Sequence, residues 1–144
     1  MLIHPVKKNP DSDFKYLCVI ESALTNATSS AGAKGFWQFM PETAKEFSLE
    51  ISSTVDERYH VIKATEAACT YLKKAYSKFG NWTLVAAAYN RGMAGVDRQL
   101  TAQGVSDYYD LYLNEETSRY VFRILALKEI MLNTDKYGYV FLNE

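Results

Sequence analysis

Apolar residues recur three or four positions apart along most of this 144-residue chain, which is the spacing of one face of an α-helix. The pattern predicts helices over residues 13–25, 41–47, 61–79, 82–91, 94–103 and 115–132. Gly80 and Gly92 are placed to end two of these helices, and Asn81 and Asn114 are placed to cap the starts of two. Because no segment has the pattern of a parallel-sheet strand, we expect a compact, mainly α domain of six or seven helices.

The two ends of the chain differ from its body. Residues 1–12 contain Pro5, Pro10 and little apolar material, so we expect a lead-in segment followed by one domain over residues 13–144. The tail over residues 137–142 is apolar, and we expect it to dock back on the core. A chain of this length buries a sufficient core without metals or disulfides.

An acidic residue interrupts the apolar face of the first predicted helix. Its apolar positions Phe14, Leu17, Cys18 and Leu24 fall at i, i+3, i+4 and i+10, and Glu21 falls at i+7 on the same face. Burial of an unpaired carboxylate is costly, so the pKa of Glu21 should rise and the group should hold a proton near neutral pH. A general acid needs that property. The alternative is a Glu at the edge of the face, with its carboxylate in water.

Two further patterns place polar groups among apolar neighbours. In residues 35–41 the amide of Gln38 is set into a bulky apolar run, and Gly32 and Gly35 would let the backbone approach a ligand closely. In residues 86–90 three alanines precede Tyr89 and Asn90, a hydroxyl and an amide. The alternatives are a turn with an aromatic plug for the first pattern, and a core Tyr with a satisfied hydroxyl for the second.

Composition excludes some functions and leaves others open. A net charge of −1 gives no electrostatic reason to expect DNA, RNA or an anionic membrane as partner. The 14% of aromatic residues, which include eleven Tyr, suit a packed core as well as a groove that stacks on sugars. Cys18 and Cys69 lie on apolar helix faces, so we expect two buried free thiols rather than a disulfide. Because no Cys or His stands at metal-ligand spacing, we expect neither a metal site nor a cofactor.

No part of the sequence has the length of a membrane span. The best uncharged stretch, residues 81–90, is far shorter than the roughly 20 apolar residues that cross a bilayer. The N-terminal residues lack the apolar core of a secretory signal. We therefore expect either a protein that stays inside the cell or the mature or excised part of an exported one.

Taken together and in order, these motifs resemble the lytic murein transglycosylases with a lysozyme-like fold. The resemblance rests on Glu21-Ser22, Gly32-Ala33, the run from Gly35 to Pro41, Val55 to Arg58, Phe79 to Trp82, Ala88 to Asn90, and Glu116-Thr117 with Tyr120-Val121. It covers roughly residues 13–133 and is closest to the membrane-bound class D type. It implies a central catalytic helix, a substrate groove, peptidoglycan glycan strands as the partner, and a place in the periplasm or cell envelope. We expect the protein to act as a monomer.

The resemblance also implies a reaction. The enzyme would cleave the β-1,4 bond between N-acetylmuramic acid and N-acetylglucosamine and form 1,6-anhydromuramoyl ends. Glu21 would protonate the glycosidic oxygen and then, as carboxylate, take the proton of the C6 hydroxyl that attacks the anomeric carbon. The acetamido group of the same sugar would stabilise the cationic intermediate, which is the substrate-assisted exception to the two-carboxylate arrangement.

Further roles follow from the same resemblance. The loop serine that bonds the reacting sugar would be Ser29, counted back from Gly32, or Ser30, counted forward from Glu21, and we prefer Ser29. Gln38 would hydrogen-bond a sugar, Tyr89 would orient the catalytic carboxylate or the sugar, and Asn90 would brace the neighbouring helix or bind substrate. Glu116 would support the site or stabilise a helix N-terminus. The residues expected around the substrate are Ser29, Ser30, Phe36, Trp37, Gln38, Met40, Tyr89, Asn90, Glu116 and Tyr120. Asp56 and Arg58 are interpreted as a structural ion pair or cap rather than as catalytic residues.

Three other functions remain open from the sequence. A hydrolase like goose-type lysozymes would use water in place of the C6 hydroxyl and would need a base, for which Asp56 and Glu57 are candidates. A non-catalytic glycan-binding module would keep the groove, although binding alone gives no reason to bury Glu21. A purely structural helical domain would leave Gln38 and Asn90 unexplained.

Overall fold

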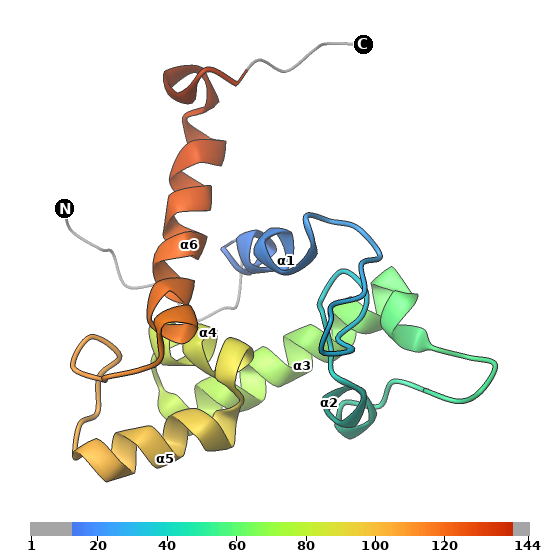
Figure 1. Cartoon of the computed structure of the whole chain (residues 1–144), viewed down its shortest axis with the longest axis horizontal. Helices are drawn as coiled ribbons and strands as arrows, with labels where there is room; N and C mark the ends of the chain where they lie inside the picture. Colours follow the sequence, from blue (N-terminus) through green and yellow to red (C-terminus); the bar gives the residue numbers. More distant parts are fainter. Residues whose placement is uncertain (1–12, 140–144) are drawn as a thin grey trace.

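The computed structural model describes residues 13–139, and six α-helices dominate them. These helices are α1 (Phe14–Ser22), α2 (Pro41–Glu46), α3 (Val61–Phe79), α4 (Trp82–Arg91), α5 (Met93–Gln103) and α6 (Glu115–Leu132) (Figure 1). Two short 3₁₀ helices, η1 (Glu57–Tyr59) and η2 (Thr134–Tyr137), precede α3 and follow α6. Within the described residues, β pairing is limited to isolated bridges such as Thr28 with Lys34. The prediction of a mainly α fold is confirmed, whereas the expected lead-in segment lies outside the described residues.

The helix at the centre of the packing is α4. It packs against α3, α5 and α6, and its middle residues, from Leu84 to Ala88, are all buried. Ala86, Ala87 and Ala88 are small enough to let neighbouring helices approach closely. Figure 1 shows α6 standing at a steep angle to α3 and α5, with α1 beside it. The expected central helix is therefore α4, while α1, which carries Glu21, packs against α6.

The predicted caps explain why several helix ends match the sequence pattern. Gly80 ends α3 with a left-handed φ of 64°. Asn81 then starts α4, since its side-chain oxygen accepts hydrogen bonds from the backbone N–H groups of Thr83 at 2.8 Å and Leu84 at 3.3 Å. Asn114 caps α6 in the same way through the N–H of Thr117. The predicted bounds of α3, α4 and α6 are thus confirmed.

The first helix is shorter than predicted. It ends at Ser22, because Ala23 and Leu24 both adopt left-handed conformations, with φ of 51° and 57°. The hydroxyl of Ser22 donates a hydrogen bond to the carbonyl of Phe36 at 2.8 Å, which ties this turn to the following loop. Leu24 consequently turns away from the core and is 54% exposed. The prediction that Leu24 continues the apolar face was wrong.

The described part of the C-terminal tail does not dock on the core. Tyr137 and Tyr139 are 41% and 58% exposed. Figure 1 shows the C-terminal end of α6 and the red turn that follows it extending beyond the other helices. Residues 140–142 of the predicted tail lie outside the described residues.

The two cysteines are free thiols, as predicted. Cys18 is buried, whereas Cys69 is only half-buried. Burial, followed by the negative charge of Glu21, raises the pKa of the Cys18 thiol to about 11. Cys18 therefore remains a neutral thiol near pH 7. No helix between residues 13 and 139 is both long enough and apolar enough to cross a bilayer.

Candidate active site

An open cleft of about 700 Å³ lies between α1, the loop before α2, α4 and α6. Glu21 lines it, together with eight of the ten residues that the sequence predicted around a substrate. These eight are Ser29, Ser30, Gln38, Met40, Tyr89, Asn90, Glu116 and Tyr120. The fold thus brings together residues that are spread over most of the described chain.

Glu21 lies at the C-terminal end of α1, with its side chain partly buried in the cleft. Burial is the largest influence on its carboxyl and raises its pKa, and the negative charge of Glu116 acts in the same direction. The hydrogen bond from Tyr120 and the positive charge of Arg123 oppose this rise. The net effect is a raised pKa, which suits a group that must give up a proton and later take one back.

Tyr120 on α6 donates its hydroxyl hydrogen to the Oε1 atom of Glu21. Its side chain is 1% exposed, and burial together with the neighbouring Glu21 carboxylate raises the pKa of Tyr120 well above its ordinary value. Tyr120 therefore stays protonated and remains a donor to Glu21. Sequence reasoning placed Tyr120 one turn after Glu116 but did not predict this contact, because the partners are 99 positions apart.

Tyr89 does not bond the catalytic carboxylate, which is one of the two roles suggested for it. Its hydroxyl donates to the backbone carbonyl of Trp37 at 2.8 Å, and its ring contacts Tyr71 with centroids 5.2 Å apart. Tyr89 therefore ties α4 to the loop before α2 while its ring lines the cleft. The hydroxyl that holds the Glu21 carboxyl belongs to Tyr120 instead.

The loop before α2 is held by glycine packing and by a side-chain amide. Gly35 has a φ of 78°, and a Cβ atom there would lie 2.0 Å from the carbonyl oxygen of Arg58. Its lack of a side chain thus permits contact with η1 rather than with a ligand. Gln38 has a φ of 49°, and its Nε2 donates to the carbonyls of Ala27 at 3.0 Å and Gly35 at 2.8 Å. Only the amide oxygen of Gln38 is left for a sugar.

Arg58 clamps the same loop from η1. Its guanidinium is 4% exposed and donates to the carbonyls of Gly32 at 3.0 Å and Phe39 at 3.1 Å. It also donates to both carboxylate oxygens of Asp56, at 2.9 and 2.8 Å. The hydrogen bond from Arg58 is the main cause that lowers the pKa of Asp56 to about 2. The prediction of a structural ion pair is confirmed.

Both candidate loop serines, Ser29 and Ser30, line the cleft. The hydroxyl oxygen of Ser29 accepts a hydrogen bond from the N–H of Ala33 at 3.0 Å, and its backbone N–H bonds the carbonyl of Ala33 at 2.9 Å. These contacts fix Ser29 and leave its O–H as a donor. Ser30 is exposed.

Asn90 braces α4 against α6, one of the two roles suggested for it. Its amide nitrogen donates to Glu116 at 2.9 Å, and its amide oxygen accepts from the hydroxyl of Thr117 at 2.8 Å. Thr117 is 1% exposed, so this contact holds the start of α6 beside the end of α4. Glu116 is thereby positioned on the cleft wall.

Phe36 and Trp37 were expected around the substrate, but neither of them lines this cleft. Trp37 is 7% exposed and turned into the core, where its indole N–H donates to the hydroxyl of Thr65 at 2.9 Å. Phe36 packs against the core, and its carbonyl accepts the hydrogen bond from Ser22. Met40, three positions after Trp37, does line the cleft.

The two candidate bases for a hydrolase also lie away from the cleft. Asp56 is engaged by Arg58, and Glu57 pairs with Lys63 and accepts from the N–H of Glu50 at 2.8 Å. Within residues 13–139, the acids that line the cleft are Glu21 and Glu116. The same residues contain no group of His, Cys, Asp and Glu side chains that could hold a metal ion.

Two cationic residues of the cleft, Arg91 and Arg123, were not predicted from the sequence. Exposed arginines on helices are usual, and neither belongs to the motifs singled out above. The helical spacing of Arg123 relative to Tyr120, at i+3, is the one feature that places it on the same side of α6.

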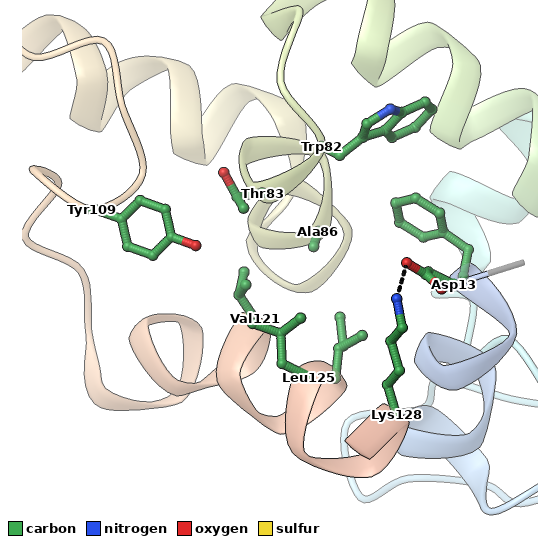
Figure 2. Close-up of a pocket in the computed structure, with 10 residues that line it drawn as sticks. Asp13, Trp82, Thr83, Ala86, Tyr109, Val121, Leu125 and Lys128 are labelled. Carbon is green, nitrogen blue, oxygen red and sulfur yellow. Dashed lines mark hydrogen bonds and ion pairs between the residues drawn. The ribbon is translucent and has the colours of Figure 1, made fainter. Parts of the chain in front are cut away.

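A second, smaller hollow lies between α1, α4 and α6 and is almost wholly apolar. Its volume is about 70 Å³, and Figure 2 shows its wall of Trp82, Tyr109, Val121 and Leu125 with the ion pair of Asp13 and Lys128 at one side. It contains no acid other than the paired Asp13. The larger cleft around Glu21 is therefore the candidate active site.

Comparisons with known proteins find similarity over most of this chain. Residues 6–111 match the family described as the transglycosylase SLT domain, a span that includes Glu21, the loop and α4. The chain is 36% identical to the membrane-bound lytic murein transglycosylase D of Escherichia coli strain K12 over 138 residues. It is equally similar to the protein of the same name from Escherichia coli O6:H1. The alignment covers 92% of this chain and 30% of the length of each relative.

Proposed function

This chain belongs to the transglycosylase SLT domain family, and from that premise we propose that it is a lytic transglycosylase of peptidoglycan. It cleaves the β-1,4 bond between N-acetylmuramic acid and N-acetylglucosamine and leaves a 1,6-anhydromuramoyl end. The names of its relatives, which are lytic murein transglycosylases, support this substrate.

The observation that carries the proposal is the environment of Glu21. Its carboxyl lies in a cleft that is open enough for a glycan strand, and burial raises its pKa. A neutral hydroxyl donor, that of Tyr120, reaches the same carboxyl. A purely structural domain has no need for a partly buried acid whose donor comes from a different helix.

The reaction uses Glu21 twice. Its carboxylic acid first gives a proton to the glycosidic oxygen, while the acetamido oxygen of the muramic acid bonds to C1 and the bond from C1 to the leaving oxygen breaks. The Glu21 carboxylate then takes the proton of the C6 hydroxyl, whose oxygen bonds to C1 and displaces the acetamido oxygen. Between the two steps the Tyr120 hydroxyl stabilises the carboxylate. No second carboxylate acts as a nucleophile.

Product analysis on purified sacculi tests the proposal. The parent protein should release anhydro products, which are lighter by one water than hydrolytic products in mass spectrometry. The Glu21→Gln variant should bind sacculi and release none. If this variant clears sacculi as fast as the parent, the assignment of Glu21 as the acid is wrong.

The same experiment separates the two rival functions. Reducing-end products would identify a hydrolase. The structure argues against a hydrolase, because the candidate bases Asp56 and Glu57 do not line the cleft. Binding of sacculi by the parent without any product would identify a glycan-binding module.

We further propose that the protein acts in the bacterial cell envelope, because the relatives are described as membrane-bound murein enzymes. We also propose a monomer, which light scattering would test.

A further inference from the structure

Two arginines of the cleft wall form no close ion pair with an acid in the described residues. Arg91 donates to the neutral amide oxygen of Asn114 at 3.2 Å. Arg123 makes neither a hydrogen bond nor an ion pair within residues 13–139. By contrast, Arg119, one turn before Arg123, pairs with Glu115 at 2.6 Å. The same lining contains two acids, Glu21 and Glu116, but neither of them forms a close ion pair with Arg91 or Arg123.

Arg123 lies close to the reacting centre. Glu116, Tyr120 and Arg123 are spaced four and three residues apart, so they share one face of α6. All three line the cleft, and Tyr120 contacts Glu21 directly. A group that binds to Arg123 would therefore sit next to the sugar on which Glu21 acts.

Arg123 also borders a second open hollow. This side hollow has a volume of about 530 Å³ and is lined by Asn114, Glu115, Glu116, Arg119 and Arg123. It shares Glu116 and Arg123 with the main cleft, so the two spaces adjoin at these side chains on α6. An unbranched strand needs the cleft alone, whereas a strand with a side group beside the cleaved bond needs space that leads away from it. The side hollow is such a space.

The chemistry of the substrate matches an unpaired guanidinium at this junction. The sugar rings of peptidoglycan are neutral, and their negative charges belong to the side group of muramic acid, as stem-peptide carboxylates or as a free lactyl carboxylate. Arg presents a planar fork of donors that matches a carboxylate in charge and shape. A role for Arg123 toward this carboxylate rests on the proposed function, because only a substrate that contains muramic acid carries the carboxylate.

We propose that Arg123 is a specificity-determining residue that binds a carboxylate of the muramic acid side group, and that the side hollow takes the stem peptide. Arg91 adds positive charge to the same cleft without direct contact. An all-N-acetylglucosamine strand carries no such carboxylate, so the protein selects the muramic acid polymer.

The test compares three soluble glycan substrates. The first keeps its stem peptides; the second has lost them to an amidase, which frees the lactyl carboxylate; the third is the second after chemical amidation of that carboxylate. The rate of anhydro-product release gives kcat/KM for the parent, Arg123→Gln and Arg123→Lys. The matched control is Arg98→Gln, since Arg98 is an exposed arginine on α5 outside the cleft lining.

Arg123→Gln should lose about tenfold more kcat/KM on a carboxylate substrate than on the amidated one, because a charge-assisted hydrogen bond is lost. Arg123→Lys should recover part of this loss, and Arg98→Gln should match the parent throughout. A loss confined to the first substrate assigns the carboxylate to the stem peptide, and a loss on the second assigns it to the lactyl group. An equal loss on all three substrates overturns the proposal, since Arg123 would then act through Glu21 alone.

A parent protein that makes no anhydro product would contradict the proposed function rather than this inference. In that case, calorimetric affinities of Glu21→Gln for the same three substrates, with and without Arg123→Gln, give the deciding comparison. Weaker binding of the carboxylate substrates alone supports the role of Arg123, and uniform binding overturns it.

Discussion

At the scale of single residues, the site depends on a hydroxyl that favours one ionisation state of its partner. The Tyr120 O–H donates to Glu21 whether the carboxyl is charged or neutral, but the bond to the charged form is stronger. It therefore lowers a pKa that burial raises. The two opposing effects leave Glu21 able to lose its proton in the first step and recover it in the second.

Replacing Tyr120 by Phe should move the pH profile upward. Without the hydroxyl the pKa of Glu21 rises further, so the acid form persists to higher pH and the fall of kcat/KM on the alkaline side shifts to higher pH. The value of kcat should drop by roughly tenfold, since the carboxylate loses the donor that orients it. Rates of anhydro-product release across pH measure both effects.

Tyr89→Phe is the matched control for this prediction. The hydroxyl of Tyr89 donates to the backbone of Trp37, so its loss should lower stability and leave the alkaline limb in place. The same shift of that limb in both variants would show that the Tyr120 contact has no specific effect on Glu21.

At the scale of elements, the loop between α1 and α2 is built to hold its cleft-facing residues against η1. Arg58 bonds two of its carbonyls, and Gly35 fits under the backbone of Arg58 with no room for a side chain. Gln38 adds bonds within the loop. The loop is therefore positioned by contacts with residues distant in the sequence, such as that between Gly32 and Arg58, 26 positions apart, and that between Trp37 and Tyr89, 52 positions apart.

A pair of glycine substitutions separates close packing from backbone strain. Gly35→Ala should cost at least about 2 kcal/mol, because its Cβ would meet the carbonyl of Arg58 and its φ is left-handed. Gly32→Ala should cost about 1 kcal/mol, since its φ is also left-handed but no atom lies within 4 Å of the added Cβ. Urea unfolding of both variants measures the difference, and equal losses would contradict the packing explanation.

The elements that the sequence predicted well are those whose signals are local. Asn81, Gly80 and Asn114 sit next to the helices they bound, so the limits of α3, α4 and α6 follow from the pattern. The end of α1 does not, because it depends on two left-handed residues and on the bond from Ser22 to Phe36, 14 positions away.

The same distinction applies to the site. Motifs identified most of the cleft residues but not their orientation. Trp37 points into the core while Gln38 and Met40 line the cleft, and this alternation depends on the path of the loop. The partner of Glu21 and the presence of Arg123 come from α6, whose position against α1 is a property of the folded chain.

At the scale of the whole molecule, the two notable acids affect stability in opposite directions. Asp56 is paired with Arg58, and its pKa of about 2 lies below its ordinary value. This pair therefore stabilises the fold above about pH 4, and the benefit is lost as pH falls toward 2. Glu21 has a raised pKa, so its protonated form is the one that the fold favours.

The Glu21→Gln variant should therefore be more stable than the parent at neutral pH. In the folded parent, ionisation of Glu21 costs free energy because the cleft disfavours the charge, and the unfolded chain does not pay that cost. Gln has a similar shape and no charge to bury. As pH falls below the ordinary pKa of a Glu side chain, the parent carries a neutral carboxyl in both states, and the advantage of the variant should disappear. Melting temperatures of both proteins from pH 4 to 8 measure this difference, and a constant difference at every pH would mean that Glu21 carries no buried charge.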